Sequence, residues 1–367
     1  MQRLSVTRRV FSVAVILLLQ ACNREIAEPV VAASNHAVGR NEDPVALGEY
    51  LVNSVGRCFW CHSPQDDGDP SSPRPEMLGA GDVLDEFTPV IAPNLTPDRE
   101  TGLGDWSDAE IARAVREGIG RDGKRLRSDH PTAYFRIMSD ADVVAVVAYL
   151  RSLRPIRNPL PRSKSQEHFR ESVQTVVEPA AQTPMEPLAR GAYLAQLGEC
   201  LGCHTTSTGS GDPRRELAFG GGRRFVETRK GYAYEVSPDP TFIEAKEPKI
   251  AEGERVVASA NLTQDPSGIP YYTPELFIQT IRTGRVAGVR QLSSAMPWIY
   301  FRRLSDDDLR AIFMYLQTAQ PVRHHVNNTD EPTMCEVCGR KHGLGDANVD
   351  PRQDAGGTAG RTSAPVR

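Results

Sequence analysis

Two short stretches decide the fold of this chain: Cys58-Phe59-Trp60-Cys61-His62 and Cys200-Leu201-Gly202-Cys203-His204. In each stretch two cysteines stand three positions apart, and a histidine follows the second cysteine directly. Residues at positions i and i+3 lie on one face of a helix, so both thiols can reach the same flat group. The histidine can then direct its imidazole at the centre of that group.

This C-x-x-C-H spacing is the pattern of c-type haem attachment. The two sulfurs can bond the two vinyl groups of one porphyrin, and the histidine can bind the iron from the proximal side. Other uses of a C-x-x-C pair are a structural disulfide or half of a zinc site. Because each pair has its own histidine, we predict two covalently bound haem c groups. Their attachment residues are Cys58, Cys61, His62, Cys200, Cys203 and His204.

The sequence repeats itself around these motifs. Residues 126–150 align without gaps on residues 292–316, and 12 of the 25 positions are identical. Shorter matches precede each motif, where Gly48-Glu49-Tyr50-Leu51 corresponds to Gly191-Ala192-Tyr193-Leu194. A long internal repeat indicates two copies of one structural unit.

Helix signals fall at matching positions in the two copies. Four residues that favour helix N-caps precede segments with helical character: Ser107, Ser139, Thr273 and Ser305. Glu110 completes a predicted capping box with Ser107. Apolar residues recur at helical spacing over 140–152 and 306–318, which predicts the last helix of each copy. The chain is therefore expected to be all-α.

On these motifs both copies resemble class I cytochrome c domains. The chain is similar to the membrane-associated cytochrome c subunits of periplasmic alcohol, gluconate and related sugar dehydrogenases. Further motifs that carry the resemblance are Asn94-Leu95-Thr96-Pro97-Asp98, Gly102-Leu103-Gly104-Asp105-Trp106-Ser107 and Met296-Pro297. The resemblance covers residues 44–155 and 187–321 and implies two tandem class I cytochrome c domains. Such subunits often carry three haem groups, whereas this chain has two C-x-x-C-H motifs.

The resemblance also implies that a methionine before the last helix binds the distal side of the iron. Met296 fits this role for the second haem, and the alternative is a methionine buried in the core. The repeat places His130 opposite Met296, which departs from the family pattern. We predict His62 and His130 as the axial ligands of the first haem, and His204 and Met296 as those of the second.

Alternatives for the first distal ligand remain open. His130 could be an exposed loop residue, and Met138 or Met77 could bind instead, although Met138 aligns with Leu304 and is expected in the core. Axial ligands move haem potentials over about 0.8 V, and histidine/methionine ligation raises them. A second imidazole stabilises Fe(III), so we expect the lower potential at the first haem and electron flow from the first haem to the second.

The N-terminus indicates export. Residues 1–21 hold Arg3, Arg8 and Arg9 and then an apolar run, which is typical of a signal peptide. Leu19-Gln20-Ala21-Cys22 resembles a lipoprotein cleavage site, so Cys22 is the predicted lipidated residue; an uncleaved anchor or a plain signal peptide are the alternatives. Removing the three arginines changes the formal net charge from −4 to −7. The expected location is the periplasm, at a membrane.

The remaining segments are predicted to connect and flank the domains. Residues 22–43 form a spacer, 156–186 a linker and 322–367 a polar tail. The second copy carries an insertion around 229–256, interpreted as a surface loop or as a cover for a haem edge or a partner. Cys335 and Cys338 in the tail lack a following histidine, so a disulfide is expected, or a metal site with His324, His325 or His342.

These features predict an electron-transfer protein rather than an enzyme. The expected donor is a periplasmic dehydrogenase, and the expected acceptor is a cytochrome or terminal oxidase. The sequence contains no run of basic residues of the kind that would indicate a nucleic-acid partner. Two alternatives are a dihaem peroxidase-like enzyme, which would need an open iron position, and a membrane-tethered redox sensor that uses the tail cysteines.

Overall fold

A computed structural model describes residues 43–66, 72–84, 91–126, 130–161, 178–207, 213–227, 233–235, 255–287, 290–326, 333–334 and 341–342. The predicted signal peptide, Cys22, most of the spacer, most of the linker and insertion, and the tail cysteines lie outside these residues. Within the described segments, no helix has the length and apolar character needed to cross a bilayer.

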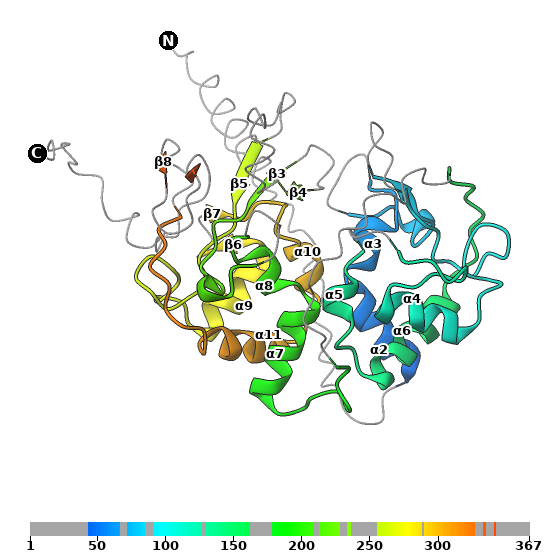
Figure 1. The fold of residues 1–367 in the computed structure, drawn as a ribbon, viewed down its shortest axis with the longest axis horizontal. Helices are drawn as coiled ribbons and strands as arrows, with labels where there is room; N and C mark the ends of the chain where they lie inside the picture. The colour runs from blue at the N-terminus through cyan, green and yellow to red at the C-terminus, as the bar shows by residue number, and fades with distance from the viewer. Residues whose placement is uncertain are drawn as a thin grey trace, which may run out of the picture. The chain divides into compact units, whose positions relative to one another are not determined.

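The first half of the described chain, residues 43–161, is built mainly from helices (Figure 1). Its elements, in chain order, are α2 (Pro44–Asn53), α3 (Cys58–Cys61), the 3₁₀ helix η1 (Pro75–Met77), β1 (Asp82–Val83), β2 (Ile91–Ala92), α4 (Asp108–Glu117), α5 (Thr132–Phe135) and α6 (Asp140–Ser152). The two strands pair antiparallel, with Asp82 opposite Ala92.

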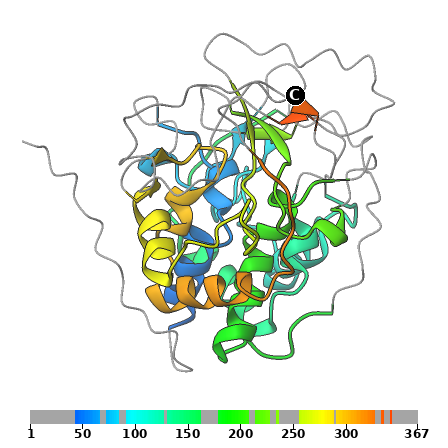
Figure 2. The same cartoon turned by 90° about the vertical axis from the view of Figure 1, so that its left-hand side faces the viewer.

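The second half, residues 178–326, repeats this order and adds strands. Its elements are α7 (Pro187–Leu197), α8 (Cys200–Cys203), η2 (Arg215–Leu217), β3 (Arg224–Glu227), β4 (Ala233–Glu235), β5 (Arg255–Ala258), α9 (Pro274–Thr283), β6 (Arg285–Val286), β7 (Arg290–Gln291), α10 (Trp298–Phe301) and α11 (Asp306–Leu316). Helices α9 and α11 pack together in this half (Figure 2). Beyond it, β8 (Thr333–Met334) pairs with β9 (Lys341–His342).

The mostly helical content predicted from the sequence is confirmed, and so are the helix caps. Ser139 and Ser305 cap α6 and α11 by accepting from the backbone N–H three residues on. Ser107 and Glu110 form both hydrogen bonds of the capping box of α4. The sequence did not predict the antiparallel sheet of order β4-β3-β5, which uses residues of the inserted segment.

Two glycines let the first and last helices of each half cross closely. A Cβ added to Gly48 in α2 would lie 1.9 Å from the carbonyl oxygen of Ala145 in α6. A Cβ added to Gly191 in α7 would lie 1.9 Å from the carbonyl oxygen of Ala311 in α11. No larger residue fits without moving a helix, which explains the glycine of each repeated G-x-Y-L segment.

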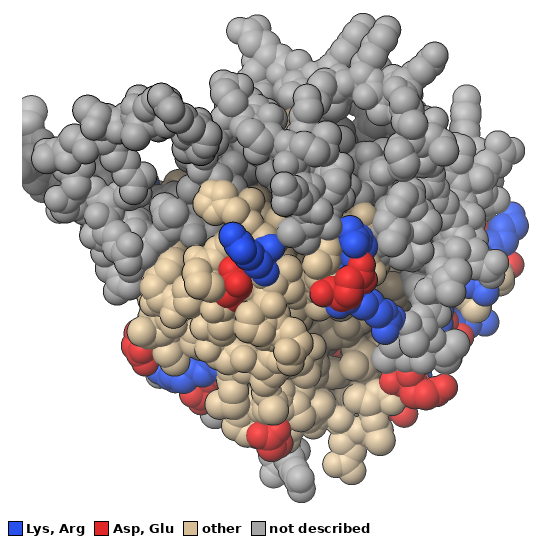
Figure 3. Space-filling view, turned by 60° about the vertical axis from the view of Figure 1, so that its left-hand side comes forward, with Lys and Arg blue, Asp and Glu red and all other residues tan. Residues whose placement is uncertain are grey.

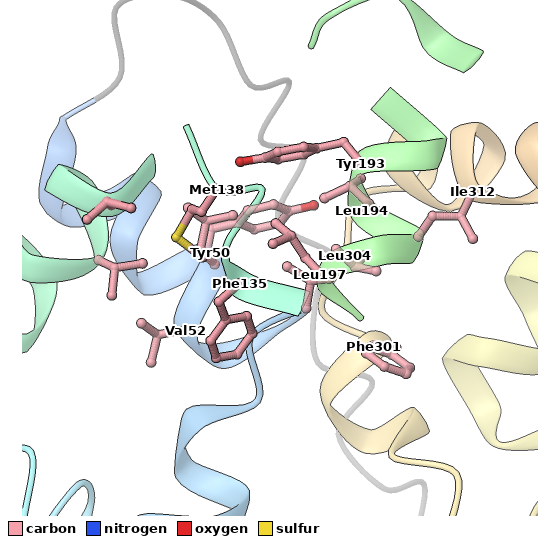
Figure 4. Close-up of a cluster of buried hydrophobic side chains, with 14 of the residues drawn as sticks. Tyr50, Val52, Phe135, Met138, Tyr193, Leu194, Leu197, Phe301, Leu304 and Ile312 are labelled. Carbon is pink, nitrogen blue, oxygen red and sulfur yellow. The ribbon is translucent and has the colours of Figure 1, made fainter. Parts of the chain in front are cut away.

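The two halves share one hydrophobic core (Figure 4). Side chains of the first half, among them Val52, Phe135 and Met138, belong to the same buried cluster as Leu197 and Phe301 of the second half. Met138 is therefore a core residue, as its alignment with Leu304 predicts.

Two tyrosines make equivalent hydrogen bonds between the halves, one from each half to the other. Tyr50 of α2 donates a hydrogen bond to Asp308 Oδ2 at 2.6 Å and accepts one from the backbone N–H of Ser305 at 2.9 Å. Both partners lie at the N-terminus of α11 in the other half. Arg190 also binds this carboxylate, with Nε and Nη2 each 2.9 Å from an oxygen of Asp308.

The second tyrosine makes the equivalent contacts in the opposite direction. Tyr193 of α7 donates to Asp142 Oδ2 at 2.5 Å and accepts from the backbone N–H of Ser139 at 3.0 Å, at the N-terminus of α6. Thr183 Oγ1 donates to the other oxygen of Asp142 at 2.9 Å. The tyrosines of the repeated G-x-Y-L segments thus hold each half against the capped last helix of the other.

The chain after each last helix folds back onto its own half. Asn94 Nδ2 donates to the carbonyl oxygen of Ile156 at 2.7 Å, and Asn261 Nδ2 donates to that of Val322 at 2.8 Å. Ile156 lies in the segment predicted as linker and Val322 in the predicted tail. The asparagines of the repeated Asn-Leu-Thr motif therefore anchor these returning segments.

Candidate functional site

Each C-x-x-C pair occupies a single helical turn. Cys58 and Cys61 bound α3, and Cys200 and Cys203 bound α8, so both thiols of a pair lie on one side of a turn, as predicted. No disulfide joins any two of these four cysteines in the part of the chain that the structure describes. Burial raises the pKa of the Cys58 thiol to about 12.

Burial likewise raises the pKa of Cys200 to about 12. The described residues also contain no group of three or more histidine, cysteine or acidic side chains arranged to hold a metal ion. Neither C-x-x-C pair therefore belongs to a larger metal-binding group among these residues.

The histidine that follows each pair is oriented by a backbone carbonyl. Nδ1 of His62 donates to the carbonyl oxygen of Pro93 at 2.7 Å, and Nδ1 of His204 donates to that of Ala260 at 2.8 Å. Both acceptors directly precede the repeated Asn-Leu-Thr motif. A histidine that binds a metal usually donates its other N–H in this way, which fixes the tautomer and leaves Nε2 for the metal.

Burial lowers the pKa of both His62 and His204, and the hydrogen bond to the carbonyl oxygen opposes this shift. The lowered pKa keeps each imidazole neutral near pH 7, which is the form that binds a metal. The sequence repeat marks the Asn-Leu-Thr segment, but it does not reveal that the preceding carbonyl orients the proximal histidine.

The predicted ligands of the second haem line one large cavity. Cys200, Cys203, His204 and Met296 all line it, and it encloses about 1380 Å³ between its walls when the part open to solvent is included. Its other walls are largely apolar and include Leu194, Val257, Leu262, Ile269, Phe277, Ile281, Leu309, Ile312 and Leu316.

The donor set and the apolar walls of this cavity fit a haem. Two thiols and a neutral imidazole line it together, and the thioether of Met296 comes from the loop that precedes α10. Apolar walls suit the flat hydrocarbon face of a porphyrin. The structure thus brings together the four residues that the sequence predicts for the second site.

In the first half, His130 is placed where the charge of His62 acts on its imidazole. Burial, and secondarily the charge of His62, lower the pKa of His130 to about 4. Nδ1 of His130 lies 2.8 Å from Thr132 Oγ1, and its ring meets that of Phe135 edge-on with centroids 6.1 Å apart. His130 is therefore a partly buried, neutral imidazole rather than an exposed loop residue. Met138 packs in the core instead.

The predicted tail is only partly described. His324 is buried, and its Nδ1 lies 2.8 Å from the carbonyl oxygen of Gly220. Cys335 and Cys338 lie outside the described residues, so their predicted disulfide or metal site stays a prediction.

Comparison with known proteins shows a family match in the first half and relatives for longer parts of the chain. Residues 45–154 match the family model of cytochrome c. The chain is 38% identical over 42% of its length to a nicotinate dehydrogenase subunit of Pseudomonas putida, and 31% identical over 45% to the gluconate 2-dehydrogenase cytochrome c subunit of Pantoea cypripedii. It is 24% identical over 86% of its length to the cytochrome c subunit of a quinone alcohol dehydrogenase of Gluconobacter oxydans.

The matches cover 13%, 38% and 63% of these three relatives, so the chain spans less than two thirds of each. The chain contains a cytochrome c domain and is related to cytochrome c subunits of dehydrogenases, as the resemblance predicted. A cytochrome c domain holds covalently bound haem c, and the cysteine and histidine positions described above are suited to it.

Proposed function

We propose that this protein is the electron-transfer cytochrome subunit of a dehydrogenase complex, with two tandem class I cytochrome c domains and two haem c groups. The observation that carries the proposal is that Met296 lines the same cavity as Cys200, Cys203 and His204. A complete pair of axial ligands closes the iron to substrates, which suits electron transfer rather than catalysis.

Each half contributes its own set of ligands. In the first half Cys58 and Cys61 would form the thioethers, and His62 and His130 would bind the iron. In the second half His204 and Met296 would bind it. Bound haem supplies a one-electron Fe(III)/Fe(II) couple.

The two distal ligands separate the potentials of the sites. The thioether of Met296 favours the reduced iron, whereas the imidazole of His130 favours the oxidised iron, so the second site has the higher potential. Electrons therefore enter at the first site from a dehydrogenase and leave from the second to a cytochrome or terminal oxidase. The cytochrome c subunits of dehydrogenases among the relatives support a dehydrogenase as donor.

The proposal places the protein in the periplasm, held at a membrane through lipidated Cys22. Its support is the signal-like sequence of residues 1–21 and the cysteine that follows. Replacement of this residue, Cys22→Ser, should release the protein from the membrane fraction.

The test is to count haem groups and electrons in the purified mature protein. Intact mass should show two haem additions, and reductive titration should consume two electrons per chain. The double variants Cys58→Ala/Cys61→Ala and Cys200→Ala/Cys203→Ala should each lose one haem. A wild-type protein with one haem, or rapid turnover of peroxide by the reduced protein, would contradict the proposal.

A further inference from the structure

The residues directly before the two C-x-x-C pairs form an ion pair with each other. Arg57 precedes Cys58 and Glu199 precedes Cys200, so the two occupy equivalent positions of the repeat. Arg57 Nη2 lies 2.6 Å from Glu199 Oε1, and the side chains are only 8% and 18% exposed. This pair joins the two attachment motifs through one side-chain contact across the interface between the halves.

Both residues adopt a backbone conformation that is uncommon outside glycine. Arg57 has φ 48° and Glu199 has φ 59°, each at the N-cap of its motif helix. Residues with positive φ persist where their surroundings fix them, and they cluster at functional sites. The shared conformation places both side chains toward the interface, where they meet.

Residues of both halves hold the guanidinium of Arg57. Its Nη1 donates to the carbonyl oxygen of Gly198 at 3.3 Å. Its Cζ lies 5.6 Å from the ring centroid of Trp60, inside the first motif, and 5.7 Å from that of Phe301 in α10. Cations at this distance from aromatic rings are attracted to them. Arg57 is thus fixed in position rather than free to reorient.

The pair also reaches the second cavity. Arg57 and Glu199 both line it, next to Cys200 and Cys203, although Arg57 belongs to the first half. Exposed ion pairs are common on this protein, where acidic and basic side chains lie close together on the surface (Figure 3). Water and salt screen those pairs, whereas buried charges act at a low effective dielectric constant.

We propose that Arg57 and Glu199 act in opposite directions on the reduction potential of the second haem site, and that their buried ion pair holds these two effects in balance. This inference rests on the proposed function, because it needs two haem groups. A cation beside the site favours the reduced iron and an anion favours the oxidised iron, so the two charges of the intact pair offset each other. Removing one charge leaves the other in the cavity wall without its partner.

The charges therefore predict shifts of opposite sign. Arg57→Gln should lower the second potential and Glu199→Gln should raise it. Each shift should be about 59 mV, which is a tenfold change in the equilibrium constant of the one-electron reduction. The double variant Arg57→Gln/Glu199→Gln should return to near the wild-type potential. Arg57→Lys, which keeps the charge, should also stay near wild type.

The experiment is a redox titration of the purified holoprotein, wild type and variants. Arg310→Gln serves as the control, because it removes a cation from an exposed pair, with Arg310 Nη1 3.1 Å from Asp307 Oδ1. Its potentials should match the wild type. Shifts of Arg57→Gln and Glu199→Gln in the same direction, or unchanged potentials with both haem groups present, would overturn the inference.

Two other outcomes also have a defined meaning. A wild-type protein with fewer than two haem groups would overturn the proposed function and this inference with it, and the haem count shows that before any variant is titrated. If Arg57→Gln loses haem, the other two variants decide. A raised second-site potential in Glu199→Gln together with a wild-type potential in Arg57→Lys supports the inference. Any other result for these two variants overturns it.

Discussion

Tyr50→Phe removes a single hydroxyl that joins the two halves. The hydroxyl donates to Asp308 at 2.6 Å and accepts from the backbone N–H of Ser305 at 2.9 Å. A hydrogen bond to a charged group contributes about 1.5–3 kcal/mol, and a buried donor left without its acceptor costs about 1–3 kcal/mol. Because Arg190 still binds Asp308, the lower ends of these ranges apply. We expect the free energy of unfolding to fall by about 2.5 kcal/mol.

The reciprocal change, Tyr193→Phe, should cost more. Its hydroxyl binds Asp142, which among the described residues is held by the hydroxyls of Tyr193 and Thr183 and not by an arginine. The change removes one of these two donors from the buried carboxylate, so we expect the free energy of unfolding to fall by about 4 kcal/mol.

The assay is guanidinium unfolding of the holoprotein followed by far-ultraviolet circular dichroism. Tyr149→Phe is the matched control, because its hydroxyl accepts from Asn53 Nδ2 at 3.0 Å within the first half. The Tyr149→Phe control should lower the free energy of unfolding by about 1 kcal/mol. The reasoning is refuted if both interface variants stay within about 0.5 kcal/mol of this control, or if Tyr50→Phe is the more damaging of the two.

Four further predictions concern the ligands, the helix crossing and the pH. His130→Met should raise the potential of the first site alone, and an unchanged value in a redox titration would count against His130 as a ligand. Met296→His should lower the second potential toward the first, with loss of the methionine–iron charge-transfer band in the absorption spectrum. Gly48→Ala should destabilise the first half by several kcal/mol, because the added Cβ would meet a backbone carbonyl of α6; thermal unfolding that matches the wild type would contradict this close crossing. Burial raises the pKa of Tyr50 and Tyr193 above the ordinary value of 10.0, so above pH 10 the unfolded chain loses protons that the folded protein keeps. Stability should therefore fall as the pH rises from 10, and either tyrosine-to-phenylalanine variant should show a smaller slope.

Local features were the part of the structure that the sequence predicted well. The range 140–152 matches α6, because the Ser139 cap and the helical spacing of apolar residues are both local signals. The tight C-x-x-C turns follow from spacing alone. The repeat placed His130 opposite Met296. The structure shows His130 partly buried, and Met296 in the cavity with His204.

Contacts between distant parts of the chain could not be predicted in this way. Tyr50 and Asp308 are 258 residues apart, and no periodicity links them. The returning segments, such as the one at Ile156, look like linker because their few hydrogen bonds depend on an asparagine far back in the chain. The sheet that contains β3 was missed because its strands are short and lie around an insertion without alternating polarity.

The most direct test of the two-site account is a redox titration of the wild-type holoprotein followed by visible and near-infrared absorbance. We predict two separate one-electron waves, with the methionine–iron charge-transfer band belonging only to the wave of higher potential. Two overlapping waves, with that band arising from both haem groups, would contradict His130 as a ligand and the proposed direction of electron flow.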